Sequence, residues 1–344
     1  MASIDSILEY LHYHPDSSRA EIMAGAGLDI GEAQGKRLLA TAIRDGWVTS
    51  KGKARAIRYS ITPKAHLLRT VDLARYYSRD IDERIVQTGF NFDLLRNLLP
   101  NVNLFSQEET ERLARLHADF SARIAKLSPD ARAKEMERLG IDLSWKSSQI
   151  EGNTYTLLET ERLLKDKREA EGKKREEAVM LLNHKEALRF LLEEPDYLSP
   201  LSVRRIEDVH SLLIGGLGVD RNIRAHRVGI TGTNYRPLDN DFQIREAMED
   251  MCALVNGKPD VFEKALLVLV LISYIQPFMD GNKRTARIVS NAVFLANGYC
   301  PLSFRSVRPD EYREALLLFY EQNNLSAFKR LFIEQVDFAV NTYF

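Results

Sequence analysis

The runs ALLVLVLISYI (residues 265–275) and QPFMDGNKRTAR (residues 276–287) decide how the chain folds. The first run is apolar on every side and predicts a buried helix, and helical spacing resumes after the second run. The Asp-Gly-Asn turn at 280–282 predicts that one helix ends there and another begins. The new helix would carry Arg284 and Arg287 beside N–H groups that have no intrahelical acceptor. Because helix N-termini flanked by cations bind phosphate, we predict a polyphosphate site.

The second run resembles the signature of the Fic family, His-x-Phe-x-Asp/Glu-Gly-Asn-x-Arg-x-x-Arg. The positions that match the family are Pro277, Phe278, Asp280, Gly281, Asn282, Arg284 and Arg287. The family's histidine, a general base for the hydroxyl that attacks the α-phosphate of ATP, is Gln276 here. An amide has no basic lone pair near neutral pH, so Gln276 cannot take that proton. The resemblance implies AMP transfer from ATP to a protein hydroxyl, weakened or redirected by Gln276.

The resemblance also implies roles for single residues. Asp280 would bind Mg²⁺, and Asn282 would hold the α-phosphate. The N–H groups of residues 281–284 and the Arg284 side chain would hold the β-phosphate, and Arg287 would take the γ-phosphate. The catalytic set is therefore Gln276, Asp280, Asn282 and Arg284, and the nucleotide-binding set is Gly281, Asn282, Lys283, Arg284 and Arg287.

A second motif, SSQIEGNT, occupies residues 147–154. Ser147, Glu151 and Gly152 match the Ser/Thr-x-x-x-Glu-Gly/Asn pattern of the family's inhibitory helix, which we place near 144–153. The Glu151 carboxylate would pair with Arg287 and so occupy the cation meant for the γ-phosphate. The alternative is a plain helix C-terminus capped by Gly152. Removal of AMP from a modified protein, with Glu151 positioning a water, is left open.

Residues 227–237 alternate and then turn, which predicts a β-hairpin. The segment resembles the Fic flap, an edge on which a target segment is added as a strand. The flap residues would be Gly229, Ile230, Thr231, Gly232 and Thr233; the alternative is a plain surface hairpin. His210 and His226 have no spacing that ties them to the nucleotide motif, and we interpret both as lone core or surface histidines.

Residues 1–66 predict three helices followed by a basic hairpin, which resembles a winged helix-turn-helix domain. The third helix would enter a DNA major groove and the wing would contact phosphates. The candidate DNA-binding residues are Gln34, Lys36, Arg37, Lys51, Lys53, Arg55 and Arg58. The alternative is a winged helix used for dimerisation or protein docking. Residues 67–140 are expected to form a helical connector and the first helices of a Fic core at 141–335.

The chain has 344 residues, a net charge of −1 and two distant cysteines, Cys252 and Cys300. This spacing indicates no metal or redox motif and fits a reducing compartment. No leader-like segment opens the sequence, and the longest apolar run is shorter than the roughly 18 residues that span a bilayer. We therefore expect a soluble, cytoplasmic protein with no membrane partner.

Together these features predict a mainly α fold: a Fic-type helical bundle with a small hairpin flap, plus the winged helix-turn-helix. The expected partners are ATP with Mg²⁺, a protein target bearing a hydroxyl, and DNA through the winged helix; a homodimer is left open. Two functions compete. One is an adenylyltransferase inhibited by Glu151, and the other is a DNA-binding transcription regulator whose Fic domain binds nucleotide without chemistry.

Overall fold

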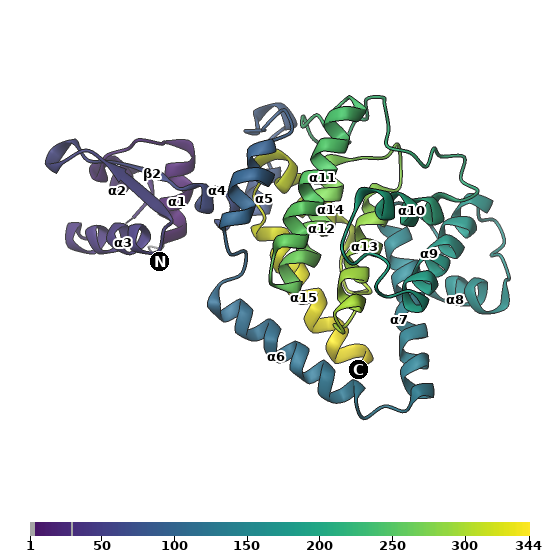
Figure 1. The fold of residues 1–344 in the computed structure, drawn as a ribbon. Helices are drawn as coiled ribbons and strands as arrows, with labels where there is room; N and C mark the ends of the chain where they lie inside the picture. The colour runs from purple at the N-terminus through teal and green to yellow at the C-terminus, as the bar shows by residue number, and fades with distance from the viewer. Residues whose placement is uncertain (1–3, 29) are drawn as a thin grey trace. The chain divides into compact units, whose positions relative to one another are not determined.

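The computed structural model describes residues 4–28 and 30–344, which divide into two compact units (Figure 1). Within the described residues, the first unit holds the chain up to Gln87, together with Gly232–Asn234 and Leu317–Ala327. The second unit holds Thr88–Thr231, Tyr235–Leu316 and Phe328–Phe344. Each unit is described by itself below.

The first unit begins with three helices whose apolar faces form one core. They are α1 (Ile4–Tyr13), α2 (Arg19–Gly25) and α3 (Glu32–Arg44). Helix α1 buries Ile7, Leu8 and Leu11, which share one face at helical spacing. A capping box opens α2, since Ser18 and Glu21 each accept a hydrogen bond from the other's backbone N–H. The three helices predicted within residues 1–66 are therefore present.

A two-stranded antiparallel sheet follows the three helices. Strand β1 (Val48–Lys51) pairs with β2 (Arg58–Ile61), so that Val48 lies opposite Ile61 and Lys51 opposite Arg58. A short 3₁₀ turn, Ala54–Ala56, joins the strands. Beyond the sheet lie α4 (Pro63–Leu68), α5 (Leu73–Tyr77) and another 3₁₀ turn, Ile81–Glu83. The predicted hairpin is present, whereas its use as a DNA-contacting wing stays a prediction.

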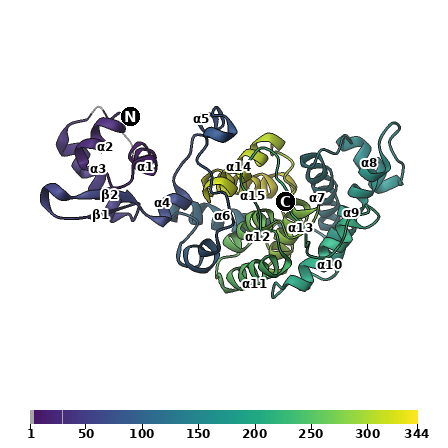
Figure 2. The same ribbon diagram turned by 90° about the horizontal axis from the view of Figure 1, so that it is seen from above.

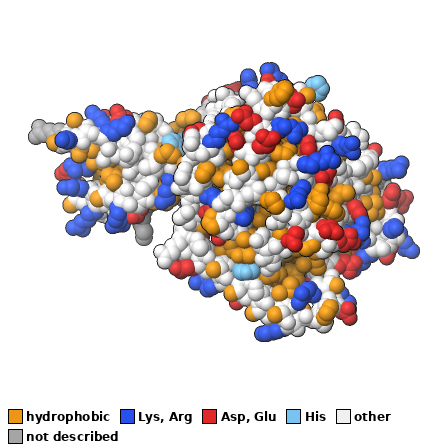
Figure 3. All heavy atoms as spheres, in the orientation of Figure 1, with side chains coloured by type: hydrophobic (Ala, Val, Ile, Leu, Met, Phe, Trp, Pro, Cys, Tyr) orange, Lys and Arg blue, Asp and Glu red, His pale blue; other side chains and the backbone are white. Residues whose placement is uncertain are grey.

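The candidate DNA-binding side chains are accessible. Figure 3 shows Lys and Arg side chains spread over the visible face of the first unit, beside acidic ones. Arg58 lies 4.0 Å from Glu21, so part of the positive charge has an acidic neighbour. The side chain of Arg55 lies outside the described part of the chain. The exposed candidates are Gln34, Lys36, Arg37, Lys51, Lys53 and Arg58.

The second unit is built from helices. It contains a π-helical turn at Leu94–Leu98, a 3₁₀ turn at Leu99–Asn101, all of α6–α13 and the larger parts of α14 and α15. The bounds are α6 (Gln107–Ile124), α7 (Pro129–Ile150), α8 (Leu157–Asp166), α9 (Arg175–Glu193), α10 (Val203–Ile214), α11 (Asp241–Gly257), α12 (Val261–Ile275), α13 (Asn282–Ala296), α14 (Pro309–Gln322) and α15 (Ser326–Tyr343).

Helix α12 is the centre of this unit. It is buried along almost its whole length, as its continuous apolar sequence predicts. It packs mainly against α13 and, less extensively, against α11, and both views show it beside these two helices (Figures 1 and 2). Helix α10 packs on α9 and on α13, and α7 packs on α9. The order of packing brings the C-terminal end of α7 and the start of α13 within reach of each other.

The predicted flap hairpin is wrong in detail. Residues 227–237 are all described, and they form a turn at 231–232 between two arms, with no paired strands. The arms are fixed by the guanidinium of Arg224, which donates to the carbonyls of His226 at 2.7 Å and Leu238 at 2.6 Å. These bonds hold the two ends of the segment in place without a ladder of cross-strand hydrogen bonds.

Among the described residues, no helix combines the length and the apolar character needed to cross a membrane.

Candidate functional site

The loop between α12 and α13 is fixed by the side chain of Asn282. Its Oδ1 accepts a hydrogen bond from the N–H of Phe278 at 2.9 Å, and its Nδ2 donates to the Phe278 carbonyl at 2.8 Å. The Phe278 ring is fully buried, which anchors the loop in the core. Gly281 begins α13 with a φ of 82°, where a side chain would be strained and its Cβ would meet Ile214 at 3.2 Å. The loop is therefore pre-formed.

The start of α13 gathers hydrogen-bond donors. The first bond of the helix runs from Thr285 N–H to the Gly281 carbonyl at 2.8 Å, so the preceding N–H groups have no acceptor inside the helix. Arg284 is only 1% exposed, and its Nη2 donates to Asp280 Oδ2 at 2.9 Å. Its Nε is buried and has no hydrogen-bond partner among the described residues. Burial lowers the pKa of Arg284 from its usual value. An anion at this helix end would accept hydrogen bonds from these N–H groups and add negative charge beside Arg284.

Gln276, which the sequence predicts to stand where the family has its base, bonds to two neighbours through its side chain. The residue adopts a left-handed conformation, with a φ of 52°, as the cap of α12. Its Nε2 donates to the Ser273 carbonyl at 2.6 Å, and its Oε1 accepts from Asn282 Nδ2 at 3.0 Å. The amide therefore completes the loop's internal bonding, and neither of its side-chain polar atoms has the basicity to remove a proton.

Glu151 and Arg287 form the ion pair expected from the sequence. Glu151 Oε1 lies 2.7 Å from Arg287 Nη2, and Lys283 Nζ lies 3.4 Å from Glu151 Oε2. Burial alone would raise the pKa of Glu151, but the cations Arg287 and Lys283 outweigh it and lower that pKa. Arg287 is completely buried, and its guanidinium lies over the Tyr312 ring at 5.3 Å. Glu151 thus stays ionised and occupies Arg287.

The last turn of α7 carries the rest of the inhibitory motif. Ser147 accepts from Arg287 twice, at its Oγ from Nε at 2.8 Å and at its carbonyl from Nη2 at 2.9 Å. Gly152, with a φ of 94°, ends the helix in the left-handed conformation that glycine adopts at low cost. Both interpretations of this motif therefore describe the same residues: Gly152 caps the helix, and the capped end presents Ser147 and Glu151 to Arg287. The inhibitory role itself stays a prediction.

His184 of α9 supports this contact and was missed in the sequence. Its Nε2 lies 2.5 Å from Ser147 Oγ in the buried interior. Ser147 Oγ accepts from Arg287, and it can donate its own proton to His184 when Nε2 is the unprotonated ring nitrogen. Burial, with Arg284 and Arg287 nearby, holds the pKa of His184 well below its usual range, consistent with a neutral ring. The sequence signal that could have identified His184 is its place as a polar residue on the apolar face of a predicted helix.

His210 of α10 is a second residue that the sequence did not connect to the site. It is buried, its Nε2 lies 2.9 Å from the Asp280 carbonyl, and its Nδ1 lies 3.2 Å from the Arg221 carbonyl. Its ring stacks on Phe278 with centroids 3.6 Å apart and planes 4° apart. His210 is therefore a core histidine but not a lone one, because its contacts lie on the loop between α12 and α13.

A single carboxylate is available for the expected Mg²⁺. The Asp280 side chain is 63% exposed, with Oδ1 accepting from the Gly281 N–H at 2.6 Å and Oδ2 from Arg284. Among the described residues, no group of three or more His, Cys, Asp or Glu could hold a metal by itself. This arrangement fits Mg²⁺, which binds through one or two carboxylates together with substrate phosphates and water. Metal binding stays a prediction.

The remaining predicted residues are not gathered at this loop. Gly229 and Thr231 are exposed and Ile230 is half-buried on the first arm of the flap, in the second unit. Gly232 and Thr233 belong to the first unit, where Arg84 Nη2 donates to the Gly232 carbonyl at 2.9 Å. That carbonyl is therefore already engaged. A target-binding role for the flap stays a prediction.

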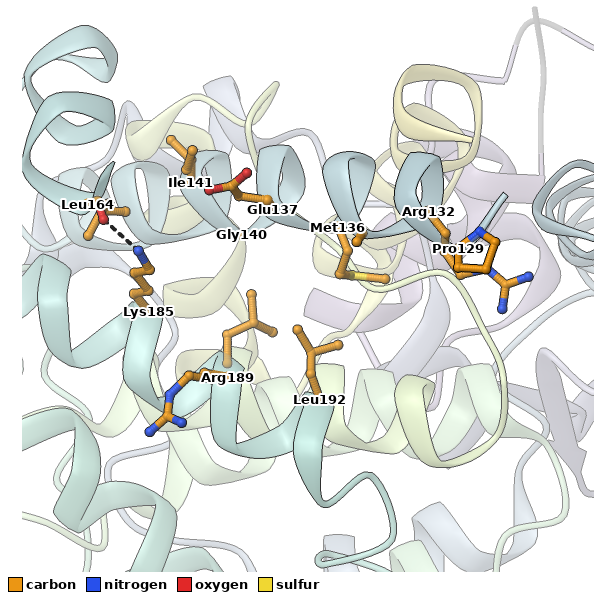
Figure 4. Close-up of a pocket in the computed structure, with 12 residues that line it drawn as sticks. Pro129, Arg132, Met136, Glu137, Gly140, Ile141, Leu164, Lys185, Arg189 and Leu192 are labelled. Carbon is orange, nitrogen blue, oxygen red and sulfur yellow. Dashed lines mark hydrogen bonds between the residues drawn. The ribbon is translucent and has the colours of Figure 1, made fainter. Parts of the chain in front are cut away.

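A separate groove lies along the N-terminal half of α7, facing α9 (Figure 4). Its volume is about 560 Å³, and its walls are mostly aliphatic, including Met136, Ile141, Leu188 and Leu192. Lys185 at its edge donates to the Leu164 carbonyl at 2.5 Å. The groove does not include the loop at 276–287, so it is not the candidate nucleotide site.

Comparisons with known proteins identify a Fic/DOC family domain within this chain. Residues 200–294 match the model of the Fic/DOC family. The chain is 28% identical over 185 residues to the protein adenylyltransferase Fic of Nematostella vectensis, covering 49% of this chain and 41% of the relative. It is 26% identical over 176 residues to the protein adenylyltransferase fic-1 of Caenorhabditis elegans, covering 48% and 34%. The chain thus spans well under half the length of these relatives.

Solved structures confirm the fold. A fragment of Fic-1 from C. elegans aligns with a TM-score of 0.60 at 21% identity, over 69% of this chain and 72% of the fragment. A Fic family protein from Desulfovibrio desulfuricans aligns with a TM-score of 0.57 at 20% identity, over 69% and 74%. The predicted fold class, mainly helical with a Fic-type bundle, is therefore confirmed.

Proposed function

We propose that this chain is a Fic-type protein adenylyltransferase that transfers AMP from ATP to a protein hydroxyl and is inhibited by Glu151. The observation that carries the proposal is the contact of Glu151 with Arg287, 2.7 Å apart, at the end of a pre-formed anion loop. A carboxylate paired there occupies a cation that a bound polyphosphate would use. The relatives named protein adenylyltransferase supply the activity that this geometry fits.

The donors at the start of α13 determine how ATP would bind. The N–H groups of residues 282–284 and the Arg284 side chain would hold the inner phosphates, and Arg287 would take the γ-phosphate once Glu151 releases it. Asp280 would hold Mg²⁺, which supplies positive charge against the phosphates. Asn282 would contribute mainly by holding the loop, since its side chain is already engaged by Phe278 and Gln276.

The proton of the attacking hydroxyl has no basic acceptor at Gln276. In the transfer, the hydroxyl oxygen bonds to the α-phosphorus while the bond to the pyrophosphate oxygen breaks and pyrophosphate leaves. The hydroxyl proton then passes to solvent. Losing a general base costs about 10²–10⁴-fold in rate. The chain would therefore be a slow transferase that depends on positioning and on charge stabilisation by Arg284 and Arg287.

Removal of AMP from a modified protein is the alternative reaction at this site. This reaction would require Glu151 to take a proton from the attacking water molecule. The cations Arg287 and Lys283 lower the pKa of Glu151, and a carboxylate of lowered pKa is a weaker base. The contact therefore favours an inhibitory carboxylate over a catalytic one.

The test is incubation of wild-type protein and Glu151→Gly with α-labelled ATP and Mg²⁺. We expect label on the protein in Glu151→Gly and little or none in wild type. Gln149→Gly, which places the same substitution in the last turn of α7, is the control and should behave as wild type. If Glu151→Gly binds ATP but acquires no label, and no added protein from a cell extract acquires any, the adenylyltransferase proposal is wrong.

A further inference from the structure

Arg224 contacts both ends of the flap segment and the beginning of the nucleotide loop. It lies in the second unit and is 3% exposed. Its Nη1 donates to the His226 carbonyl at 2.7 Å and its Nη2 to the Leu238 carbonyl at 2.6 Å. Its Nε donates to the Gln276 carbonyl at 2.6 Å. One guanidinium therefore connects three separate stretches of backbone.

The backbone of Arg224 adds a fourth connection. Its N–H donates to the Pro277 carbonyl at 3.0 Å, next to the carbonyl that its side chain holds. Burial lowers the pKa of Arg224 from its usual value. An arginine remains protonated even so, and the carbonyl oxygens, not a carboxylate, surround its charge. A buried cation that bonds only to backbone carbonyls fixes the positions of those backbones.

We propose that Arg224 is a positioning residue that fixes the two ends of the flap, at residues 226 and 238 of the second unit, relative to the loop between α12 and α13. The proposal rests on the proposed transferase function, because this spacing matters where a target on the flap must meet the α-phosphate. The flap has no strand ladder of its own, so its placement depends on contacts such as those of this side chain and of Tyr235, whose hydroxyl donates to the Tyr274 carbonyl at 3.0 Å. Lysine cannot replace it, since a single ammonium group cannot reproduce the planar set of donors.

Two variants of the same chain test the proposal. Arg224→Lys keeps the charge and removes the planar donor set. Arg204→Lys makes the same substitution outside the flap, on α10, where the side chain is 82% exposed and lies 3.4 Å from Asp208. Both are made in the Glu151→Gly background. Three quantities are measured: hydrogen exchange along the chain, ATP affinity by calorimetry, and the rate at which the protein acquires label from α-labelled ATP.

For Arg224→Lys we expect hydrogen exchange of residues 226–238 to rise about tenfold, while α12 and the body of α13 stay protected. ATP affinity should change less than about twofold, because the phosphate donors lie in residues 282–287. The labelling rate at saturating ATP should fall roughly 10–100-fold, as a misplacement of about 1 Å in a reacting group does. Arg204→Lys should match its parent in all three quantities.

The positioning role would be overturned if the hydrogen-exchange rate of residues 226–238 did not change. It would also be overturned if that rate rose equally throughout the helical core. The second result would show that Arg224 supports only the global fold. The measurements also separate this proposal from the proposed function. If the Glu151→Gly parent acquires no label, the transferase proposal fails, whereas the exchange data still decide whether Arg224 positions the flap.

Discussion

Glu151 Oε1 lies 2.7 Å from Arg287 Nη2, although the two residues are 136 positions apart in the sequence. The carboxylate comes from the end of α7, and the guanidinium comes from the second turn of α13. This pair connects the N-terminal half of the second unit to the nucleotide loop. It holds Arg287 in a place where the cation is buried, stacked on Tyr312 and already neutralised.

Glu151→Gln should increase affinity for ATP and lower the stability of the free protein. The substitution keeps the size of the side chain but removes the charge that neutralises Arg287. We expect ATP to bind about tenfold more tightly and AMP to be little affected, because Arg287 would meet the outermost phosphate. Loss of this charged hydrogen bond should cost about 2 kcal/mol in the free energy of unfolding. Calorimetry with ATP and AMP, and chemical unfolding, measure the two effects.

An equal gain in affinity for ATP and AMP would contradict the assignment of Arg287 to the outermost phosphate. Gln149→Ala, in the same helical turn, is the control and should alter neither quantity by more than the error of the measurement.

Gln276→His in the Glu151→Gly background should accelerate AMP transfer by about 100-fold, since a general base commonly contributes 10²–10⁴-fold. The imidazole would replace an amide that bonds to Ser273 of α12 and to Asn282 at the start of α13. Gln276→Asn is the matched control, because it also disturbs these contacts but supplies no base. Initial labelling rates at saturating ATP check the prediction. Equal rates in the two variants would show that this position does not contact the attacking hydroxyl.

The sequence predicted the helix–loop–helix because its signals are local. An apolar run of this length must be buried, and Asp-Gly-Asn must turn, whatever the surrounding fold. The Glu151–Arg287 pair is long-range, and composition or periodicity could not place it; the family resemblance did. The sequence signal for the basic hairpin of the first unit was also local, because turn residues lie between two short runs typical of strands.

His184, His210 and Arg224 could not be connected to the site from the sequence. Each acts through a tertiary contact with a backbone or a hydroxyl, and such contacts leave no spacing rule. The flap hairpin was predicted from alternation, but alternation reports only an extended backbone. In the structure, residues 227–237 pair no strands, and Arg224 holds the carbonyls of His226 and Leu238 on either side of them.

His210→Phe should weaken ATP binding about five- to tenfold. Phenylalanine can keep the stacking on Phe278, but it loses the contact between His210 Nε2 and the Asp280 carbonyl. The carbonyl would then be released, and with it the loop that carries the free N–H groups of α13. His226→Phe, at an exposed position before the flap, is the control and should bind ATP as wild type does. Calorimetric titration with ATP and Mg²⁺ compares the two. Wild-type affinity in His210→Phe would show that the loop does not need this contact.

The buried His184 predicts how stability depends on pH. Burial lowers its folded-state pKa, so below about pH 6.5 the unfolded chain binds a proton that the folded chain does not. The free energy of unfolding should therefore fall as the pH drops below 6.5, by up to about 1.4 kcal/mol per pH unit from this residue.

His184→Gln removes that contribution while its amide oxygen can still accept from Ser147, so its stability should depend less steeply on pH between 6.5 and 5. Leu182→Gln, exposed on the same helix, should keep the wild-type slope. Chemical unfolding at a series of pH values measures these slopes. An equal slope in His184→Gln and wild type would mean that His184 takes up its proton in the folded protein. That result would contradict its role as the neutral acceptor of Ser147.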